Sequence, residues 1–319
     1  MQLFSFPDNF QWGVATAAYQ IEGAVKKDGR EDCTWDEFCR RPGMILENHD
    51  GAIACDHYHR YKTDVALIKA LGVDAYRFSI AWPRIFPHGE GPANQKGIDF
   101  YKSLCEELLK VGITPFATLF HWDLPLTLEQ KYGGWRSKET VKRFADYAAY
   151  IANALGGYIK NFFTINETAC FTLFAHTAKG DVFHAPGKIE PRKTVNQIVH
   201  NALLAHGSAL LAIKDEIPNA QVGFAELCNS YMPIYDQKEH VDAAYKAFRK
   251  ENLQILFPRF DGKYDPRFLE HGGSNAPEFT DEEMKIIASP MDFIGVNYYH
   301  CAAVRAADNA DGYQVIPYP

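Results

Sequence analysis

The chain has 319 residues, enough for one large domain or two small ones, and 47% of them are hydrophobic, which can supply a core. Its net charge of −7 argues against a nucleic acid or an anionic membrane as partner. The sequence contains no apolar run of about 18 residues, so it predicts no membrane span.

The cysteines favour a reduced, cytoplasmic protein. Seven are scattered along the chain without a CxxC pair. Cys55 and His57 lie close together, but no second pair at the spacing of a zinc site accompanies them. Residues Met1 to Ser5 show no basic region followed by an apolar one, so no signal peptide is expected. We therefore expect free thiols rather than a disulfide framework or a zinc site.

The first predicted strand lies within residues 10–24, where small residues mix with larger ones as in tightly packed barrel strands. Gln20 follows it and is expected to point into the mouth of the sheet. The segment from there to Ala54 is predicted to be a long loop, polar and rich in Gly and Asp. Loops of this length in compact domains are usually functional or disordered.

Helical and strand patterns then alternate along the chain. Apolar periodicity predicts helices over residues 56–71, 95–111, 138–155, 194–216 and 240–256, with a capping box at Thr280 and Glu283 opening a short further helix. Apolar runs predict strands over residues 75–82, 114–120, 162–165, 220–227 and 293–300. With the first strand this makes six, and their alternation with helices predicts a parallel α/β arrangement.

Glu167 ends one of these strands. Asn166 and Glu167 close the apolar run 162–165, and polar groups at the carboxyl end of a buried strand are how a (β/α)8 barrel presents catalytic side chains. The barrel mouth would half desolvate this carboxyl group, which favours its protonated form and suits it to give up a proton. The alternative is a structural glutamate in an ion pair at a strand end.

Two other strands carry candidate site residues. His121 and Trp122 follow the strand 114–120 and could bond a ligand hydroxyl and face its ring. The alternative for His121 is a core histidine with a satisfied hydrogen bond. Arg77 lies inside an apolar strand, where a charge is costly unless it is paired. It could hold a carboxylate inside the barrel, or belong to a purely structural pair.

The chain closely resembles glycoside hydrolase family 1, the β-glucosidase and β-galactosidase family, over essentially all 319 residues. Six motifs carry this resemblance in the family's order: FQWGVATAAYQIEG at residues 10–23, YRFSIAWPR at 76–84, HWDLP at 121–125, TINE at 164–167, HAPG at 184–187 and IGVNYY at 294–299. The resemblance implies a (β/α)8 TIM barrel and a retaining β-glycosidase that works without a metal or organic cofactor. The HWDLP motif resembles the branch acting on plain glycosides rather than on 6-phosphosugars.

The resemblance also implies a role for each matching residue. Glu167 matches the acid/base catalyst, and Arg77 and Tyr299 match residues that support the nucleophile. The expected substrate-binding residues are Gln20, His121, Trp122, Asn166, Asn297 and Tyr299. A retaining enzyme needs two carboxyl groups about 5–5.5 Å apart, one to attack and one to protonate the leaving oxygen. Asn166 would hold the 2-hydroxyl group, a bond that strengthens in the transition state.

The chain departs from the family in two ways. Thr168 stands where the family usually has proline after the acid/base. The family's nucleophile motif, Ile/Val-Thr-Glu-Asn-Gly, is missing, since the Glu-Asn pairs at Glu47 and Glu251 do not end predicted strands. We therefore expect residues 1–319 to form a single barrel domain with about six of eight βα units, strands seven and eight being absent. The nucleophilic glutamate is expected beyond this chain.

Three functional hypotheses follow, of which the third is a hydrolase that uses an outside nucleophile on the remaining site. In the first, the protein is a β-glucosidase-like hydrolase that cleaves terminal β-D-glycosyl residues by double displacement, and this chain is its acid/base half. In the second, it is a truncated, non-catalytic sugar-binding relative, or a fragment that needs a partner chain. The expected partners are a β-glycoside or short oligosaccharide and either a second copy or a complementing C-terminal fragment. Nucleic acid and membrane are not expected.

Overall fold

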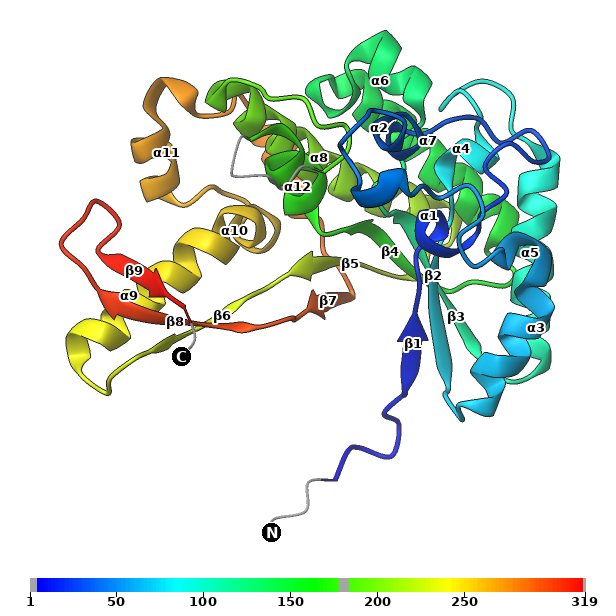
Figure 1. Ribbon diagram of the computed structural model, residues 1–319, viewed down its shortest axis with the longest axis horizontal. Coiled ribbons are helices and arrows are strands. Elements are labelled where there is room, and N and C mark those ends of the chain that lie inside the picture. The colour runs from blue at the N-terminus through cyan, green and yellow to red at the C-terminus, as the bar shows by residue number, and fades with distance from the viewer. Residues whose placement is uncertain (1–4, 178–183, 318–319) are drawn as a thin grey trace.

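A computed structural model describes residues 5–177 and 184–317. Its main feature is a six-stranded sheet in the order β1-β2-β3-β4-β5-β7. The strands are β1 (Gly13–Ala15), β2 (Ala75–Ser79), β3 (Thr114–Phe120), β4 (Asn161–Asn166), β5 (Gln221–Leu227) and β7 (Phe293–Asn297). Every neighbouring pair is parallel. The sheet curves into a half-barrel whose two edges, β1 and β7, do not pair with each other (Figure 1).

Helices connect these strands and cover the outer face of the sheet, because parallel strands need crossover connections (Figure 1). The long ones are α3 (His57–Ala70), α5 (Gln95–Lys110), α7 (Lys138–Leu155) and α8 (Arg192–Glu216). Shorter helices are α1 (Ala18–Ile21), α2 (Thr34–Cys39), α4 (Trp82–Ile85), α6 (Leu126–Tyr132), α9 (Lys238–Phe248), α10 (Gln254–Asp261), α11 (Pro266–Gly272) and α12 (Asp281–Ile287). Single turns are η1 (Leu46–Asn48), η2 (Gly134–Arg136), η3 (Cys170–Phe174), η4 (Arg249–Leu253) and η5 (Gly273–Asn275).

The core lies between the sheet and this outer layer. Trp82 and Tyr147 stack with ring centroids 5.0 Å apart, and Phe144 packs against both rings. The hydroxyl of Tyr147 donates to the backbone oxygens of Ile80 and Leu119 at 3.0 and 3.2 Å. Helix α7 is therefore fixed to the carboxyl ends of β2 and β3 by apolar contact and by hydrogen bonds at once.

Most predicted elements are confirmed, with differences at their ends. Ser137 caps α7 by accepting from the backbone N–H of Glu139 at 3.1 Å, and Thr280 forms the expected capping box at α12. The predicted strand 75–82 ends at Ser79. The predicted helix 240–256 is interrupted by η4, a π-helical turn. Leu71, the last residue of the predicted helix 56–71, lies just after the last turn of α3 and is 67% exposed.

The first strand is much shorter than predicted, and Gln20 lies on helix α1 instead of directly after a strand. The segment up to Ala54 is not a plain loop, since it contains α2, whose first turn is closed by a capping box between Cys33 and Asp36. Of the segment considered for a signal peptide, the first four residues lie outside the described part. No helix within residues 5–177 and 184–317 is long and apolar enough to cross a membrane.

A small second sheet was not predicted. It consists of β6 (Ser230–Pro233), β8 (Cys301–Ala306) and β9 (Tyr313–Ile316), in the order β6-β8-β9. It continues β5 and β7 beyond their carboxyl ends, and α9 packs on it through Ala243, Ala247 and Val304 (Figure 1). These strands are short and carry no clear alternation, so their pairing with one another and their contact with α9 define them.

We expect Phe144→Ala to lower the free energy of unfolding by about 3–5 kcal/mol, because it removes a fully buried ring from the centre of the core. Urea denaturation of the purified chain measures this change. Leu67→Ala is the matched control: Leu67 is 61% exposed, so its loss should change stability by no more than about 0.5 kcal/mol. Equal effects of the two substitutions would contradict this assignment of the core.

Candidate active site

The predicted site residues meet at the carboxyl end of the half-barrel. Asn166 is the last residue of β4, and Glu167 follows it. His121 follows β3, and Asn297 ends β7. Arg77 reaches the same place from β2. Because the carboxyl ends of parallel strands lie at one edge of the sheet, residues more than 200 positions apart converge here.

Asn166 connects these strands. Its Oδ1 accepts from Arg77 Nη2 at 2.7 Å and from Asn297 Nδ2 at 3.1 Å. Its Nδ2 lies 3.3 Å from His121 Nε2, and its backbone oxygen accepts from the indole N–H of Trp122 at 2.9 Å. The side chain is 1% exposed, so these partners replace the water that a buried amide requires.

Glu167 is held tightly at the same edge. It is 3% exposed, and its carboxylate accepts from Asn297 Nδ2 at 2.6 Å, from the hydroxyl of Tyr299 at 3.1 Å and from Cys170 Sγ at 3.1 Å. Its φ of 50° is a left-handed conformation, which is rare for a residue with a side chain and occurs where surrounding contacts enforce it. The backbone N–H of Glu167 bonds the oxygen of Ala225 on β5 at 2.8 Å.

The role of Arg77 and Tyr299 as supports of a nucleophile stays a prediction, and the described residues show which groups the two side chains contact. Within the described residues, Arg77 donates to the hydroxyl of Thr118 at 2.8 Å and to Asn166, and it lies 4.3 Å from the ring centroid of Phe163. Burial lowers the pKa of Arg77 to about 10, although the charge of Glu167 opposes this shift. The hydroxyl of Tyr299 donates to the carboxylate of Glu167 at 3.1 Å.

A cavity of about 350 Å³ opens beside this cluster and is lined by Gln20, Trp35, His121 and Trp122, among others. Burial and the charge of Arg77 lower the pKa of His121 to about 3, so its imidazole is neutral at pH 7. The rings of Trp122 and His184 pack edge to face with their centroids 4.7 Å apart, and Trp122 adopts a φ of 79°. A neutral imidazole, an amide and an indole around one cavity suit a ring that carries hydroxyl groups.

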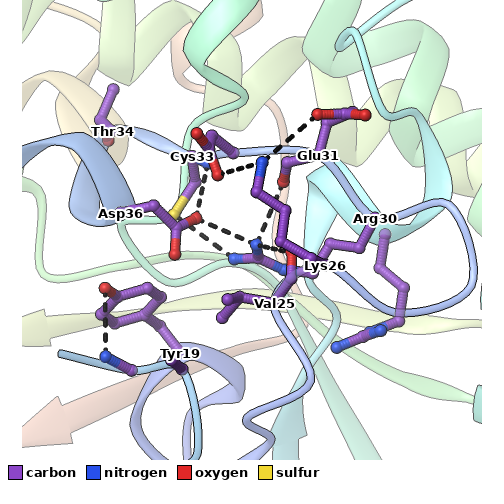
Figure 2. Close-up of polar contacts among 12 residues, drawn as sticks. Tyr19, Val25, Lys26, Arg30, Glu31, Cys33, Thr34 and Asp36 are labelled. Atoms are coloured by element: carbon purple, nitrogen blue, oxygen red, sulfur yellow. Dashed lines mark hydrogen bonds and ion pairs between the residues drawn. The ribbon is translucent and has the colours of Figure 1, made fainter.

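Arg30 fixes the wall of this cavity. Its Nη1 donates to the backbone oxygens of Val25 and Glu31 and to Asp36 Oδ2, all within 3.1 Å (Figure 2). The same Asp36 oxygen accepts from the backbone N–H of Cys33 at 2.8 Å (Figure 2). Asp36 thus closes the start of α2, the helix that carries Trp35 into the cavity.

The structure therefore brings Arg77, His121, Trp122, Asn166, Glu167, Asn297 and Tyr299 together. Gln20 lines the cavity without a hydrogen bond to this cluster. Cys170 was missed, and its only sequence signal is its position three residues after Glu167. Within the described ranges, no three His, Cys, Asp or Glu side chains gather in a way that could hold a metal ion.

The comparisons with known proteins agree with the resemblance seen in the sequence. The sequence profile of Glycosyl hydrolase family 1 matches residues 3–315. Beta-glucosidase A of Acetivibrio thermocellus is 42% identical over 307 residues, which are 96% of this chain and 67% of the relative. Beta-glucosidase of an Agrobacterium species is 41% identical, over 96% of this chain and 65% of the relative. The chain thus spans about two thirds of the length of these curated relatives.

Solved structures give the same picture. The family 1 β-glucosidase of Thermotoga maritima superposes with a TM-score of 0.90 at 37% identity, covering 98% of this chain and 69% of the other. The same protein has been solved in complex with deoxynojirimycin, and the virulence factor SghA, 40% identical to this chain, in complex with its substrate analogue salicin. The predicted fold class, a (β/α)8 barrel represented by about six of its βα units, is confirmed.

The pH dependence of stability should reveal a raised pKa of Asp123. This residue follows Trp122 and is 1% exposed. Burial raises its pKa from 3.8 to about 7, although Arg30 opposes this. The folded state therefore holds this proton more tightly than the unfolded state. The resulting stabilisation is complete below about pH 4 and is lost as the pH rises to about 7.

Asp123→Asn mimics the protonated form and should remove this dependence. We expect the unfolding free energy of the variant minus that of the parent to rise by roughly 1 kcal/mol per pH unit across this window. Urea denaturation of both proteins at several pH values gives the difference. Parallel stability curves would show that the pKa of Asp123 is the same in the folded protein as in the unfolded chain.

Proposed function

The chain belongs to glycosyl hydrolase family 1, and from this premise we propose that it is the acid/base half of a retaining β-glucosidase-type enzyme. The proposed reaction is the cleavage of terminal β-D-glycosyl residues by double displacement, with Glu167 as the acid/base. One observation carries the proposal: Glu167 is a buried carboxyl group at the end of β4, next to Asn166 and close to the residues that line a sugar-sized cavity. No metal or organic cofactor enters this mechanism.

Glu167 first gives a proton to the departing glycosidic oxygen and later removes one from the water that releases the sugar. The attacking group must be a second carboxylate about 5–5.5 Å away. Glu226, also at the end of a strand, is 2% exposed and paired with Arg259, so it is not free to attack. We therefore assign the nucleophile to a segment outside these 319 residues, and Arg77 and Tyr299 to its support once it is present.

The sugar is proposed to lie between the cluster and the cavity wall. Gln20 and the neutral imidazole of His121 bond its hydroxyl groups, Trp122 faces the ring, and Asn166 holds the 2-hydroxyl group. Asn297 completes the polar lining near Glu167. The named β-glucosidases among the relatives support a glucoside as substrate. The alternative of a non-catalytic sugar-binding relative is not favoured by these comparisons.

The remaining parts of the proposal concern the setting of the enzyme. Residues 1–319 are proposed to form one barrel domain, completed by a complementing C-terminal segment or by a second copy of the chain. A cytoplasmic location is supported by the seven cysteines, none of which forms a disulfide.

Glu167→Gln tests the central assignment. In protein supplied with the complementing segment, we expect the variant to hydrolyse 4-nitrophenyl β-D-glucoside with a kcat about 10²- to 10⁴-fold lower, since it cannot transfer the proton. Circular dichroism checks that the fold is retained. Unchanged turnover would exclude Glu167 as the acid/base. Turnover by the 319-residue chain alone would contradict an outside nucleophile.

Gln20→Ala tests the sugar site without requiring turnover. Because Gln20 is exposed and makes no hydrogen bond to the cluster, its loss should leave the fold intact. We expect the dissociation constant of deoxynojirimycin, measured by calorimetry, to rise about tenfold through the loss of one hydrogen bond. Gln221→Ala, at the amino end of β5, is the matched control and should bind as the parent does. Equal affinities of all three proteins would place the sugar elsewhere.

A further inference from the structure

A buried ion pair lies directly behind Glu167. Arg259 on α10 is 1% exposed and donates to Glu226 Oε2 on β5 at 2.8 Å. Its second terminal nitrogen donates to the hydroxyl of Thr168 at 2.9 Å, and its guanidinium carbon lies 4.0 Å from the ring centroid of Phe224. Burying two charges in this way is costly, and apolar residues of similar size often give equal stability. The pair is therefore of interest for what it holds in place.

The hydrogen-bond ladder between β4 and β5 is irregular next to Glu167. The register between β4 and β5 shifts between Phe163 and Asn166, and Glu167 then adopts its left-handed φ of 50°. Two backbone hydrogen bonds fix the strand end: the N–H of Glu167 donates to the oxygen of Ala225 at 2.8 Å, and its own oxygen accepts from the N–H of Cys170 at 3.0 Å. The next anchor is the side chain of Thr168, which is fully buried and bonded to Arg259.

The identity of residue 168 fits this view. A proline at this position would fix φ through its ring without any outside contact. Threonine has no such constraint, so a partner from outside the segment can add to the local hydrogen bond that the Thr172 hydroxyl donates to the backbone oxygen of Thr168 at 2.7 Å. Arg259 supplies that partner and connects it to the neighbouring strand through Glu226.

We propose that Thr168, Arg259 and Glu226 form a brace that positions the carboxyl group of Glu167 for proton transfer. Arg259 is then a positioning residue, because it acts on Glu167 only through Thr168. This inference rests on the proposed function of Glu167. A brace of this kind matters to catalysis, since a misplacement of about 1 Å in a reacting group can cost about 100-fold in rate.

The test compares leaving groups, because a purely structural role affects all substrates alike. The 2,4-dinitrophenolate ion departs without a proton, whereas phenolate departure from phenyl β-D-glucoside needs the acid. In protein supplied with the complementing segment, we expect Thr168→Val to lower kcat/KM for the phenyl glucoside about tenfold more than for the dinitrophenyl glucoside. Thr168→Ser keeps the hydroxyl group and should show the same ratio of kcat/KM for the two substrates as the parent.

Thr140→Val provides the matched control, since Thr140 is also fully buried but its hydroxyl bonds the backbone oxygen of Gly134, which is not one of the site residues. We expect Thr140→Val to leave the ratio of kcat/KM for the two substrates unchanged. If Thr168→Val lowers kcat/KM equally for both substrates, or for neither of them, the brace does not position Glu167. Arg259→Met should give the same selective loss if it folds, and Thr168→Val keeps the test valid if it does not.

Amide hydrogen exchange of the 319-residue chain gives a second measure that needs no turnover. Faster exchange at Glu167 in Thr168→Val, but not in Thr168→Ser or Thr140→Val, supports the brace. Unchanged exchange overturns it. Failure of the proposed function shows itself separately, as hydrolysis that does not depend on Glu167.

Discussion

The hydrogen bonds of Asn166 are the constraint on which the site depends. Its amide oxygen accepts hydrogen bonds from Arg77 on β2 and Asn297 on β7, and its amide nitrogen bonds His121 after β3. These strands belong to different βα units, so the geometry of the site is set by how the whole sheet curves. Because the amide is buried, any change in strand spacing leaves a polar group without a partner, which costs about 1–3 kcal/mol. The site and the curvature of the sheet are therefore stabilised together.

The same network accounts for the strained backbone at the site. Glu167 and Trp122 both adopt positive φ, at 50° and 79°. Each is fixed by a neighbour of Asn166 or by Asn166 itself: Glu167 through Asn297, and Trp122 through its indole bond to the backbone oxygen of Asn166. Conformations of this kind cost about 1–3 kcal/mol each and persist only when surrounding contacts outweigh that cost. In return, the two side chains are directed toward one edge of the barrel.

How much of this the sequence could predict depends on the range of the interaction. Apolar periodicity located α5 and β3 closely, and polar strand ends located His121 and Glu167, because both signals are local. The small sheet β6-β8-β9 escaped prediction, since its short strands are defined by packing on α9. The partner of Thr168 also escaped, because Arg259 lies 91 residues further along the chain. Such contacts between residues far apart along the chain cannot be inferred from a single sequence.

The open edges of the half-barrel connect folding to chemistry. Strand β7 exposes Ile294 and Val296, and Trp12 beside β1 is 56% exposed in a cluster with Phe6 and Phe10. Apolar side chains beside unpaired strand edges bind another strand or aggregate. A segment that closes the barrel covers both edges at once and arrives next to Asn297 and Tyr299 at the end of β7. Under the proposed function, the segment that covers these edges is therefore also the one that brings the second carboxylate, so that closing the barrel and completing the active site are one event.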